Sequence, residues 1–464
     1  MGFCAAPSYT CVAKPAWKRV NMNNDRNHAS TGRGLRETGI GASARASIDC
    51  GGVLNHDTTR QPKTKSNIRA LVLLVFVLGA SAFAAASFSK SIQGADFPDF
   101  YCAARMVADG QGHQLYDAAL QRQYQARYAG RVGTLYIHPP FETVLYLSVA
   151  WLPLLPAYLL WCLLNIGFLA LALRRLTTDL LNPWHWSIFL AASLTFVPVL
   201  LCLQQGQDSI LLLLLVVLGF TALHSSRAFA AGCLLALGLF KFQIVLPLIF
   251  VLFVRAGSKA RAKLAKGFAL VALALAGLSA AICGWSVFSA YPKFLLDLRT
   301  QQYAGVVPQG MANFRGLVFL LSRSERSGWA IVTLTVLSVA ALIQTLFAWD
   351  GIGLSRNPAG TNLRELDLSF ATSLLFALLV SYHLNPHDLS LALLPISLCG
   401  SYAFAEHLAI TRNEKRITLA LLALLFLPPL HIVALRAGFY ELVGIPLIAL
   451  FLLSTFFLRR GQAA

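Results

Sequence analysis

Long apolar runs separated by short polar segments dominate the chain after residue 69. As helices, eleven of these runs are long enough, or nearly so, to cross the roughly 30 Å hydrocarbon core of a membrane. A single segment in lipid must be helical, because only a helix satisfies all of its own backbone hydrogen bonds. A shorter run at 141–154 is predicted to be re-entrant or tilted, and the 228–254 run can be split at Lys241. The pattern therefore predicts an all-α polytopic membrane protein with about 11 to 13 transmembrane helices. The eleven runs are 70–88, 156–173, 188–203, 209–223, 228–254, 264–285, 329–349, 368–382, 389–405, 417–435 and 442–458.

Composition agrees with this class, because 57% apolar residues, 12% charged residues and a mean hydropathy of +0.63 exclude an ordinary soluble protein. Residues 1–69 are rich in Ser, Thr, Asn and Gly and carry eleven Lys and Arg against four acids. We expect a disordered, cytoplasmic N-terminal segment there, in which Met22 offers a second start, followed by a transmembrane domain at 70–460.

Positive charge predicts the orientation of the chain. The basic clusters at 255–266, 411–416 and 459–460 are expected on the cytoplasmic side with the N-terminus, which puts the loop at 89–140 outside. Anionic headgroups account for the net charge of +18, and no basic patch interleaved with aromatic residues predicts a nucleic-acid partner. Two topologies remain open between 156 and 254. The charge rule favours the one that brings Gln207 and Lys241 outside, near Asp96.

The polar segment at 94–140 is too long for a simple connection between two membrane helices. It contains Asp96 and Asp99, then the pattern LYDAALQRQYQARY at 115–128 and YIHPPF at 136–141, which together predict an ordered, helical ledge on the membrane surface. Tyr101 and Arg105 are four residues apart and share a helical face. Alternatively the two aspartates only cap this helix, Asp99 being the better-placed cap.

Three further polar groups interrupt apolar sequence, where polar residues are costly and usually face a protein interior or a wet cavity. QQGQDS at 204–209 is either a turn or a hinge that faces substrate. Lys241 lies too deep in its run to snorkel, so either the helix breaks at a surface or the ammonium serves an anionic group inside the protein.

The third group is SYHLNPHDLS at 381–390. His383 and His387 are four residues apart, but Pro386 breaks their common helical face, so we expect hydrogen bonds to phosphate or sugar rather than a metal site. The nine cysteines are scattered without CxxC or Cys/His spacing, and they predict no zinc site.

Several ordered motifs between 94 and 395 carry a resemblance to a known family. GADFPDFYCAAR followed by GHQLYD, then YIHPPF, LQQGQDSILLLLL and AAGCLLALGLFKFQ resemble the motifs of glycosyltransferase family 87. These are membrane enzymes of the GT-C type that use polyprenyl-phosphate sugars, often mannosyltransferases in bacteria. Asp208 and Ser209 stand where asparagine is commoner, Phe242 replaces a proline, and the histidine segment matches only loosely.

The resemblance implies transfer of a hexose, with mannose the expectation, from a lipid-linked donor to a lipid or glycan acceptor in the bacterial inner membrane, without a cofactor or metal. Such transfer needs a general base and groups that stabilise the leaving phosphate. We expect Asp96 as the base, with Asp99 as a possible partner, and Lys241 at the phosphate with Arg105 as the alternative. The remaining expected substrate contacts are Tyr101, Tyr116, His138, Gln207, His383 and His387.

A transporter or flippase that moves a lipid-linked saccharide without breaking a bond is the alternative function, and a non-catalytic assembly factor is a third. The external loop is harder to explain in a transporter. A sugar-nucleotide enzyme is not favoured, because the sequence contains no GxGxxG motif and no large soluble region. The sequence leaves open the sugar, the acceptor and the oligomeric state.

Overall fold

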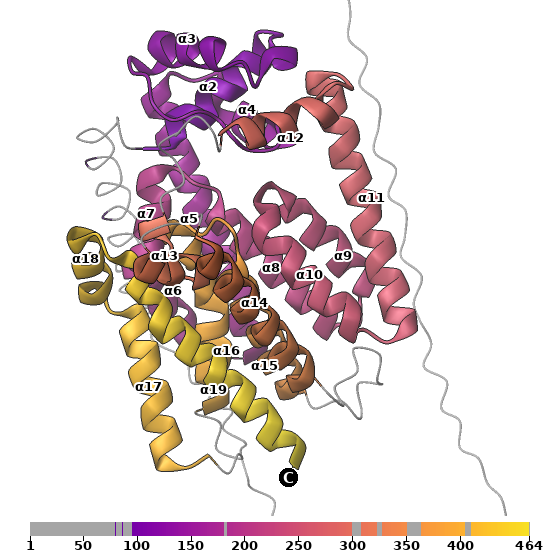
Figure 1. The fold of residues 1–464 in the computed structure, drawn as a ribbon, viewed down its shortest axis with the longest axis vertical. Coiled ribbons are helices and arrows are strands. Elements are labelled where there is room, and N and C mark those ends of the chain that lie inside the picture. Colours follow the sequence, from indigo (N-terminus) through magenta and orange to yellow (C-terminus); the bar gives the residue numbers. More distant parts are fainter. Residues whose placement is uncertain are drawn as a thin grey trace, which may run out of the picture. The chain divides into compact units, whose positions relative to one another are not determined.

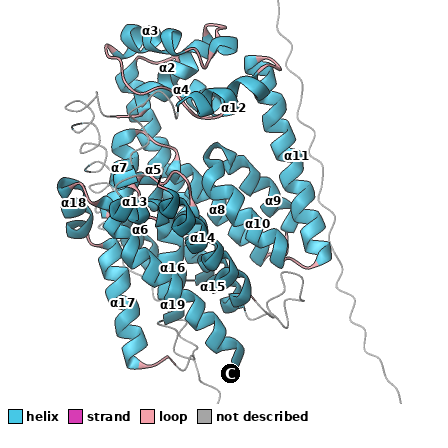
Figure 2. Ribbon diagram, viewed as in Figure 1, coloured by secondary structure: helices cyan, strands magenta, loops and turns pink. Residues whose placement is uncertain are grey.

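A computed structural model describes residues 79, 86, 95–180, 183–298, 308–322, 327–349, 363–403 and 410–463. The N-terminal segment at 1–69 and nearly all of the expected first span at 70–88 lie outside these residues. Every regular element in the described part is an α-helix or a 3₁₀ helix, which confirms the all-α prediction (Figure 2). All of these elements belong to one compact unit, Gln61–Ala464.

The elements follow one another along the chain as labelled in Figure 1. They are α2 (Phe97–Ala108), η2 (Gly112–Gln114), α3 (Ala118–Ala129), η3 (Pro140–Glu142), α4 (Thr143–Ala150), α5 (Leu154–Leu180), α6 (Pro183–Thr195), α7 (Val197–Gln205), α8 (Ser209–His224), α9 (Ala228–Leu237), η4 (Gly238–Lys241), α10 (Phe242–Arg255), α11 (Ser258–Cys283), α12 (Val287–Leu298), η5 (Pro308–Gly310), α13 (Phe314–Ser322), α14 (Gly328–Ala348), α15 (Leu363–Val380), η6 (Pro386–Ala392), α16 (Leu393–Ala403), α17 (Arg412–Phe426), α18 (Pro428–Ala437), η7 (Tyr440–Val443) and α19 (Gly444–Ala463).

Five helical segments of the described residues are long and apolar enough to cross a membrane. Two bent pairs raise the number to seven: α6 and α7, which meet at 68°, and α17 and α18, which meet at 51°. The protein is therefore a polytopic membrane protein, although these spans are fewer than the 11 to 13 expected. One reason is that α8 has only 16 residues and lies almost wholly inside the protein, where an apolar helix needs no lipid contact. The five segments are Leu154–Thr177, Ala228–Arg255, Ser258–Cys283, Gly328–Ala348 and Tyr440–Arg460.

Lys241 interrupts its apolar run without ending the span. The α9 helix tightens into the 3₁₀ turn η4 at Gly238–Lys241, and α10 then continues to Arg255. The expected break at Lys241 is thus present as a local change of helix type. A short 3₁₀ stretch inside a longer helix often marks a functional hinge or a strained position.

The segment after residue 95 folds into an ordered helical layer, as expected for a ledge. Helix α2 packs on α3 and α4, and Figure 1 shows α2, α3 and α4 gathered at one end of the helical bundle. Tyr101 Oη donates to the Leu152 carbonyl (2.8 Å) and Arg105 Nη1 donates to the Ala150 carbonyl (2.9 Å). These two side chains therefore share a face and satisfy carbonyls at the end of α4.

Helix α11 follows α10 in the chain and reaches this layer with its C-terminal end. Close to its C-terminus, at Ile282, it contacts Gly112, and it also packs on η3. Its first turns carry Lys259, Lys263 and Lys266, which lie roughly 24 to 35 Å away along the helix at 1.5 Å per residue. The basic cluster and the α2–α4 layer are therefore separated by about one hydrocarbon thickness.

Candidate active site

Asp96 lies at the start of α2, yet its carboxylate does not cap the helix. Gln207 Nε2 donates to Asp96 Oδ2 (2.5 Å), and the Asp96 backbone N–H donates to Gln205 Oε1 (3.1 Å). The polar turn between α7 and α8 thus faces the aspartate, and the capping interpretation of Asp96 is wrong. Burial raises the pKa of Asp96 above its ordinary value, although the bond from Gln207 opposes this effect.

A glycine makes this contact between α2 and the α7–α8 turn possible. Gly206 has a φ of +66°, and a Cβ on it would lie 2.5 Å from the Phe97 Cβ. Only glycine adopts this left-handed conformation at low cost and also lets Phe97 approach so closely. The turn residues on either side of Gly206 are consequently held against the start of α2.

Lys241 connects this turn to the loop before α16. Its Nζ lies 3.2 Å from Asp208 Oδ1 and 3.0 Å from Asp388 Oδ1, and it donates to Gln207 Oε1 (3.3 Å). Because an ammonium only donates, the Gln207 oxygen must face Lys241 and its NH₂ must face Asp96. Lys241 thereby fixes the amide that holds Asp96. The ammonium does serve anionic groups inside the protein, and those groups are two carboxylates of the chain itself.

The histidine loop supplies the second of these carboxylates. Burial alone would raise the pKa of Asp388, but the neighbouring Lys241 ammonium lowers it well below its usual range. Asp388 also accepts hydrogen bonds from Ser209 Oγ (2.8 Å) and from the Asn385 backbone N–H (2.8 Å). The buried His387 has its Nε2 3.6 Å from Asp388 Oδ1. Asp388 is therefore an ionised anchor for the loop.

His383 occupies the more open part of the same loop. It is partly exposed, and the Asn385 side-chain amide lies 3.1 Å from its Nε2. Burial lowers the pKa of His383 to about 4 and that of His387 to about 3, so both rings are neutral near pH 7. In the described part of the chain no three His, Cys, Asp or Glu side chains are grouped as metal ligands would be.

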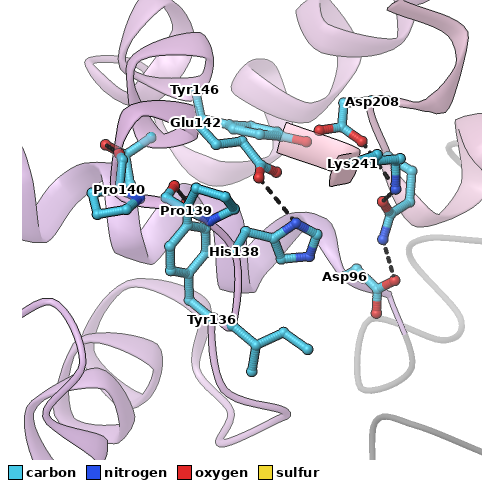
Figure 3. Close-up of polar contacts among 12 residues, drawn as sticks. Asp96, Tyr136, His138, Pro139, Pro140, Glu142, Tyr146, Asp208 and Lys241 are labelled. Atoms are coloured by element: carbon cyan, nitrogen blue, oxygen red, sulfur yellow. Dashed lines mark hydrogen bonds and ion pairs between the residues drawn. The ribbon is translucent and has the colours of Figure 1, made fainter. Parts of the chain in front are cut away.

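His138 approaches the cluster from the loop before α4. Its Nδ1 lies 3.0 Å from Glu142 Oε2, and its backbone carbonyl accepts a hydrogen bond from Tyr116 Oη (2.8 Å). Figure 3 shows the ring between the Glu142 carboxyl and Asp96, and His138 and Asp96 influence each other electrostatically. Glu142 and Asp208 in turn each affect the pKa of the other's carboxyl group.

Solvent exposure separates these side chains into two layers. Asp96 and His383 are partly exposed, and the His138 side chain is 21% exposed. These groups can touch a substrate. The polar groups behind them are buried and can only support the first layer in the present arrangement; they are Glu142, Gln207, Asp208, Lys241, His387 and Asp388.

Asp99 does not join Asp96 in this network. Its buried carboxylate accepts hydrogen bonds from Thr134 Oγ1 and from Gln125 Nε2 (2.9 Å), and Arg131 Nη2 lies 3.3 Å away. Burial raises the pKa of Asp99 to about 7. Asp99, like Tyr101 and Arg105 described above, binds groups of the ledge itself, so the expected pairing of Asp99 with Asp96 is not found in the structure.

Several residues of the network were not among the expected site residues. The sequence could have identified Asp208 and Asp388 as candidate site residues, since each is an acid beside an apolar helix. It gave little reason to select Glu142, because acids are common at the start of a helix, where they interact favourably with the helix dipole. Arg315 on α13 is another: its guanidinium lies 3.9 Å from the centre of the Tyr382 ring, and Nη1 donates to the Tyr382 carbonyl (2.6 Å).

Comparison with known protein families gives a match. The model of glycosyltransferase family 87 matches residues 136–382, just over half of the chain. This range includes His138, Glu142, Gln207 and Lys241, while Asp96 precedes it, so the placement of Asp96 depends on the contacts described above. No curated protein matches the sequence. With its polytopic helical fold and this match, the chain belongs to glycosyltransferase family 87 and is a membrane glycosyltransferase.

Proposed function

We propose that the protein transfers a hexose, mannose by family resemblance, from a polyprenyl-phosphate donor to a lipid or glycan acceptor at the external face of a bacterial inner membrane. Asp96 is the general base that takes the proton of the acceptor hydroxyl. The observation that carries this assignment is the partly exposed Asp96 carboxylate, to which, within the described residues, only Gln207 donates from a side chain. Its raised pKa makes it a stronger base than an ordinary aspartate.

The leaving phosphate needs positive charge or hydrogen-bond donors. Lys241 was the expected group, but its ammonium is buried between Asp208 and Asp388. We assign the phosphate instead to the partly exposed His383, with the buried Arg315 behind it contributing positive charge through its electrostatic interaction with the ring. Arg315→Met should raise the KM for donor more than it lowers kcat, whereas Arg436→Met, on an exposed arginine of α18, should change neither. An unchanged donor KM in Arg315→Met would contradict the assignment.

An apolar groove supports a donor that arrives on a lipid. The groove has a volume of about 430 Å³ and is formed by α10, α14 and α15. It begins close to the site, since Leu246 follows Lys241 by five residues and Val380 immediately precedes the histidine loop. A prenyl chain in this groove could leave its phosphate at the site while the chain stays among apolar side chains. The lining residues are Leu246, Pro247, Phe250, Ser338, Val339, Leu342, Phe376 and Val380.

The groove can be tested by filling it. Leu246→Trp should raise the KM for a long-chain polyprenyl-phosphate sugar and have little effect on a short-chain analogue. Leu273→Trp on α11 is the matched control, because Leu273 is 72% exposed and does not line the groove. Equal effects of the two substitutions on the long-chain donor would argue against the groove as the lipid site.

The external orientation is supported by the separation along α11. Its basic N-terminal turns fit the cytoplasmic interface, and its far end contacts the layer that contains η2 and η3. A cysteine introduced at the exposed position Gln114 should react with a membrane-impermeant maleimide in intact cells, while one at Lys263 should react only after permeabilisation. The reverse labelling would place the site in the cytoplasm.

The experiment that tests the function as a whole is transfer by purified protein in detergent. The protein is incubated with radiolabelled polyprenyl-phosphate mannose, glucose or arabinose and a lipid extract of its host. We expect label from the mannose donor to appear in a new product, with Asp96→Asn as the inactive control. No label transfer from any of the donors would contradict the proposed donor class.

A further inference from the structure

Two buried carboxyl groups, Glu142 and Asp208, lie behind the exposed site. Both are fully enclosed, and each affects the pKa of the other. Two ionised carboxylates in so enclosed a position would need cations or hydrogen-bond donors to balance their charge. Apart from the contacts with His138 and Lys241, the four oxygen atoms receive no hydrogen bond from the described residues while both groups are ionised.

A shared proton also agrees with the charges around the pair. Burial, first of all, raises the pKa of Glu142 to about 8 and that of Asp208 to about 7. Lys241 lies 3.2 Å from Asp208 but also 3.0 Å from the ionised Asp388, so its single charge cannot neutralise two further carboxylates. A proton shared between Glu142 and Asp208 leaves one negative charge on the pair instead of two, which reduces their repulsion.

The side of Glu142 that faces away from Asp208 meets His138. Glu142 Oε2 lies 3.0 Å from His138 Nδ1, four residues earlier in the chain. With the shared proton between the two carboxyls, this oxygen is an acceptor, so Nδ1 carries the ring proton and Nε2 presents a lone pair. Burial lowers the pKa of His138 to about 4, which keeps the ring neutral in this tautomer.

Other contacts hold the ring and its backbone in place. Tyr116 Oη donates to the His138 carbonyl (2.8 Å), and Tyr291 Oη donates to the carbonyl of Ile137 (3.1 Å). The Phe100 ring packs edge-on against the imidazole, with 4.8 Å between the ring centres. These contacts and the one with Glu142 hold His138 from three sides, and Figure 3 shows its ring between Glu142 and Asp96.

We propose that Glu142 and Asp208 act as a proton-sharing pair that orients His138, so that its Nε2 accepts a hydrogen bond from a hydroxyl group of the transferred sugar while Asp96 acts on the acceptor. Glu142 is a positioning residue that works through His138. This inference rests on the proposed transferase function. It adds a second contact for the sugar that does not belong to the base or to the phosphate site.

Variants at Glu142 separate this role from a merely structural one. Glutamine reproduces the protonated acid, since its carbonyl can accept from His138 and its NH₂ can donate to Asp208. Glu142→Gln should keep kcat/KM within about threefold at pH 7, whereas Glu142→Leu should lower it about 10- to 100-fold through misplacement of the imidazole. In a His138→Ala background, Glu142→Leu should have little further effect, because the residue through which it acts is gone. Equal losses in the Gln and Leu variants, or additive losses in the double variant, would overturn the proposal.

A second readout needs no substrate. The folded-state pKa of Glu142 is raised from 4.5 to about 8, so its contribution to stability is complete below pH 4.5 and is lost as the pH rises to about 8. The Tm of the wild type should therefore fall more over this range than the Tm of Glu142→Gln. The groups that face Glu142 are common to both proteins; they are His138, Asp208, Lys241, Tyr116, Tyr136, Tyr146 and Tyr291.

The two readouts distinguish the possible failures. Parallel Tm curves for the wild type and Glu142→Gln would exclude the shared proton whatever the substrate is. A steeper wild-type curve without any sugar transfer by the wild type would keep the carboxyl pair and contradict the proposed transferase function.

Discussion

Lys241→Met distinguishes a lysine that holds the site together from one that binds the phosphate of the donor. The substitution keeps a long apolar side chain but removes the ammonium from between Asp208 and Asp388, at 3.2 and 3.0 Å. Removing one partner of a buried ion pair leaves an uncompensated charge and costs about 3 to 5 kcal/mol. With an unfolding entropy of about 2 cal/mol/K per residue, this loss lowers the Tm of a chain this size by roughly 3 to 5 °C.

The assay is thermal unfolding of the purified protein in detergent, in parallel with donor binding. Lys263→Met is the matched control, because Lys263 is exposed on α11, and its Tm should stay within about 1 °C of the wild type. Adding Asp208→Asn to Lys241→Met should recover part of the lost stability, since it removes one of the uncompensated carboxylates. A wild-type Tm for Lys241→Met combined with lost donor binding would refute the supporting role and restore the phosphate role expected from the sequence.

Three further predictions concern the groups around the network. Gly206→Ala should destabilise the protein by about 2 to 4 kcal/mol in chemical denaturation, because Gly206 has a φ of +66° and no space for a Cβ. Gly130 has a similar φ but open space around it, so Gly130→Ala should cost only about 1 kcal/mol. Asp99→Asn should lower stability by about 1 to 3 kcal/mol and leave kcat within about threefold, so a loss of kcat like that of a missing base would show that Asp99 takes part in the chemistry. Tyr116→Phe removes the hydrogen bond to the His138 carbonyl and should lower kcat/KM up to about tenfold, with a stability loss of about 1 kcal/mol.

The helical class and most helix positions could be predicted from the sequence, because membrane helices are written as long apolar runs. The number of spans could not be predicted in the same way. The run that forms α8 has the composition of a spanning helix, and only tertiary packing encloses it within the protein. The bends at Phe196 and Leu427 divide two further runs, each directly before a helix that has proline in its first turn.

The gathering of Gln207 and Lys241 near Asp96 was expected from charge and topology, and their contacts confirm it. The partners within the network were not predictable, since Asp96 and Gln207 are 111 residues apart and the turn at Gly206 must first pack against α2. Local polarity also does not show that Asp99 is bound by side chains of its own loop. A polar residue in a long loop can either stabilise the loop or bind substrate, and a single sequence does not distinguish these two roles.

The central claim is that Asp96 removes the proton of the acceptor hydroxyl. Asp96→Asn keeps the size of the side chain, and sugar transfer from labelled polyprenyl-phosphate mannose is measured at matched protein amounts and confirmed folding. The expected result is a kcat about 10²- to 10⁴-fold below the wild type, with a Tm within about 2 °C of it. Wild-type turnover by the folded Asp96→Asn protein would contradict the claim.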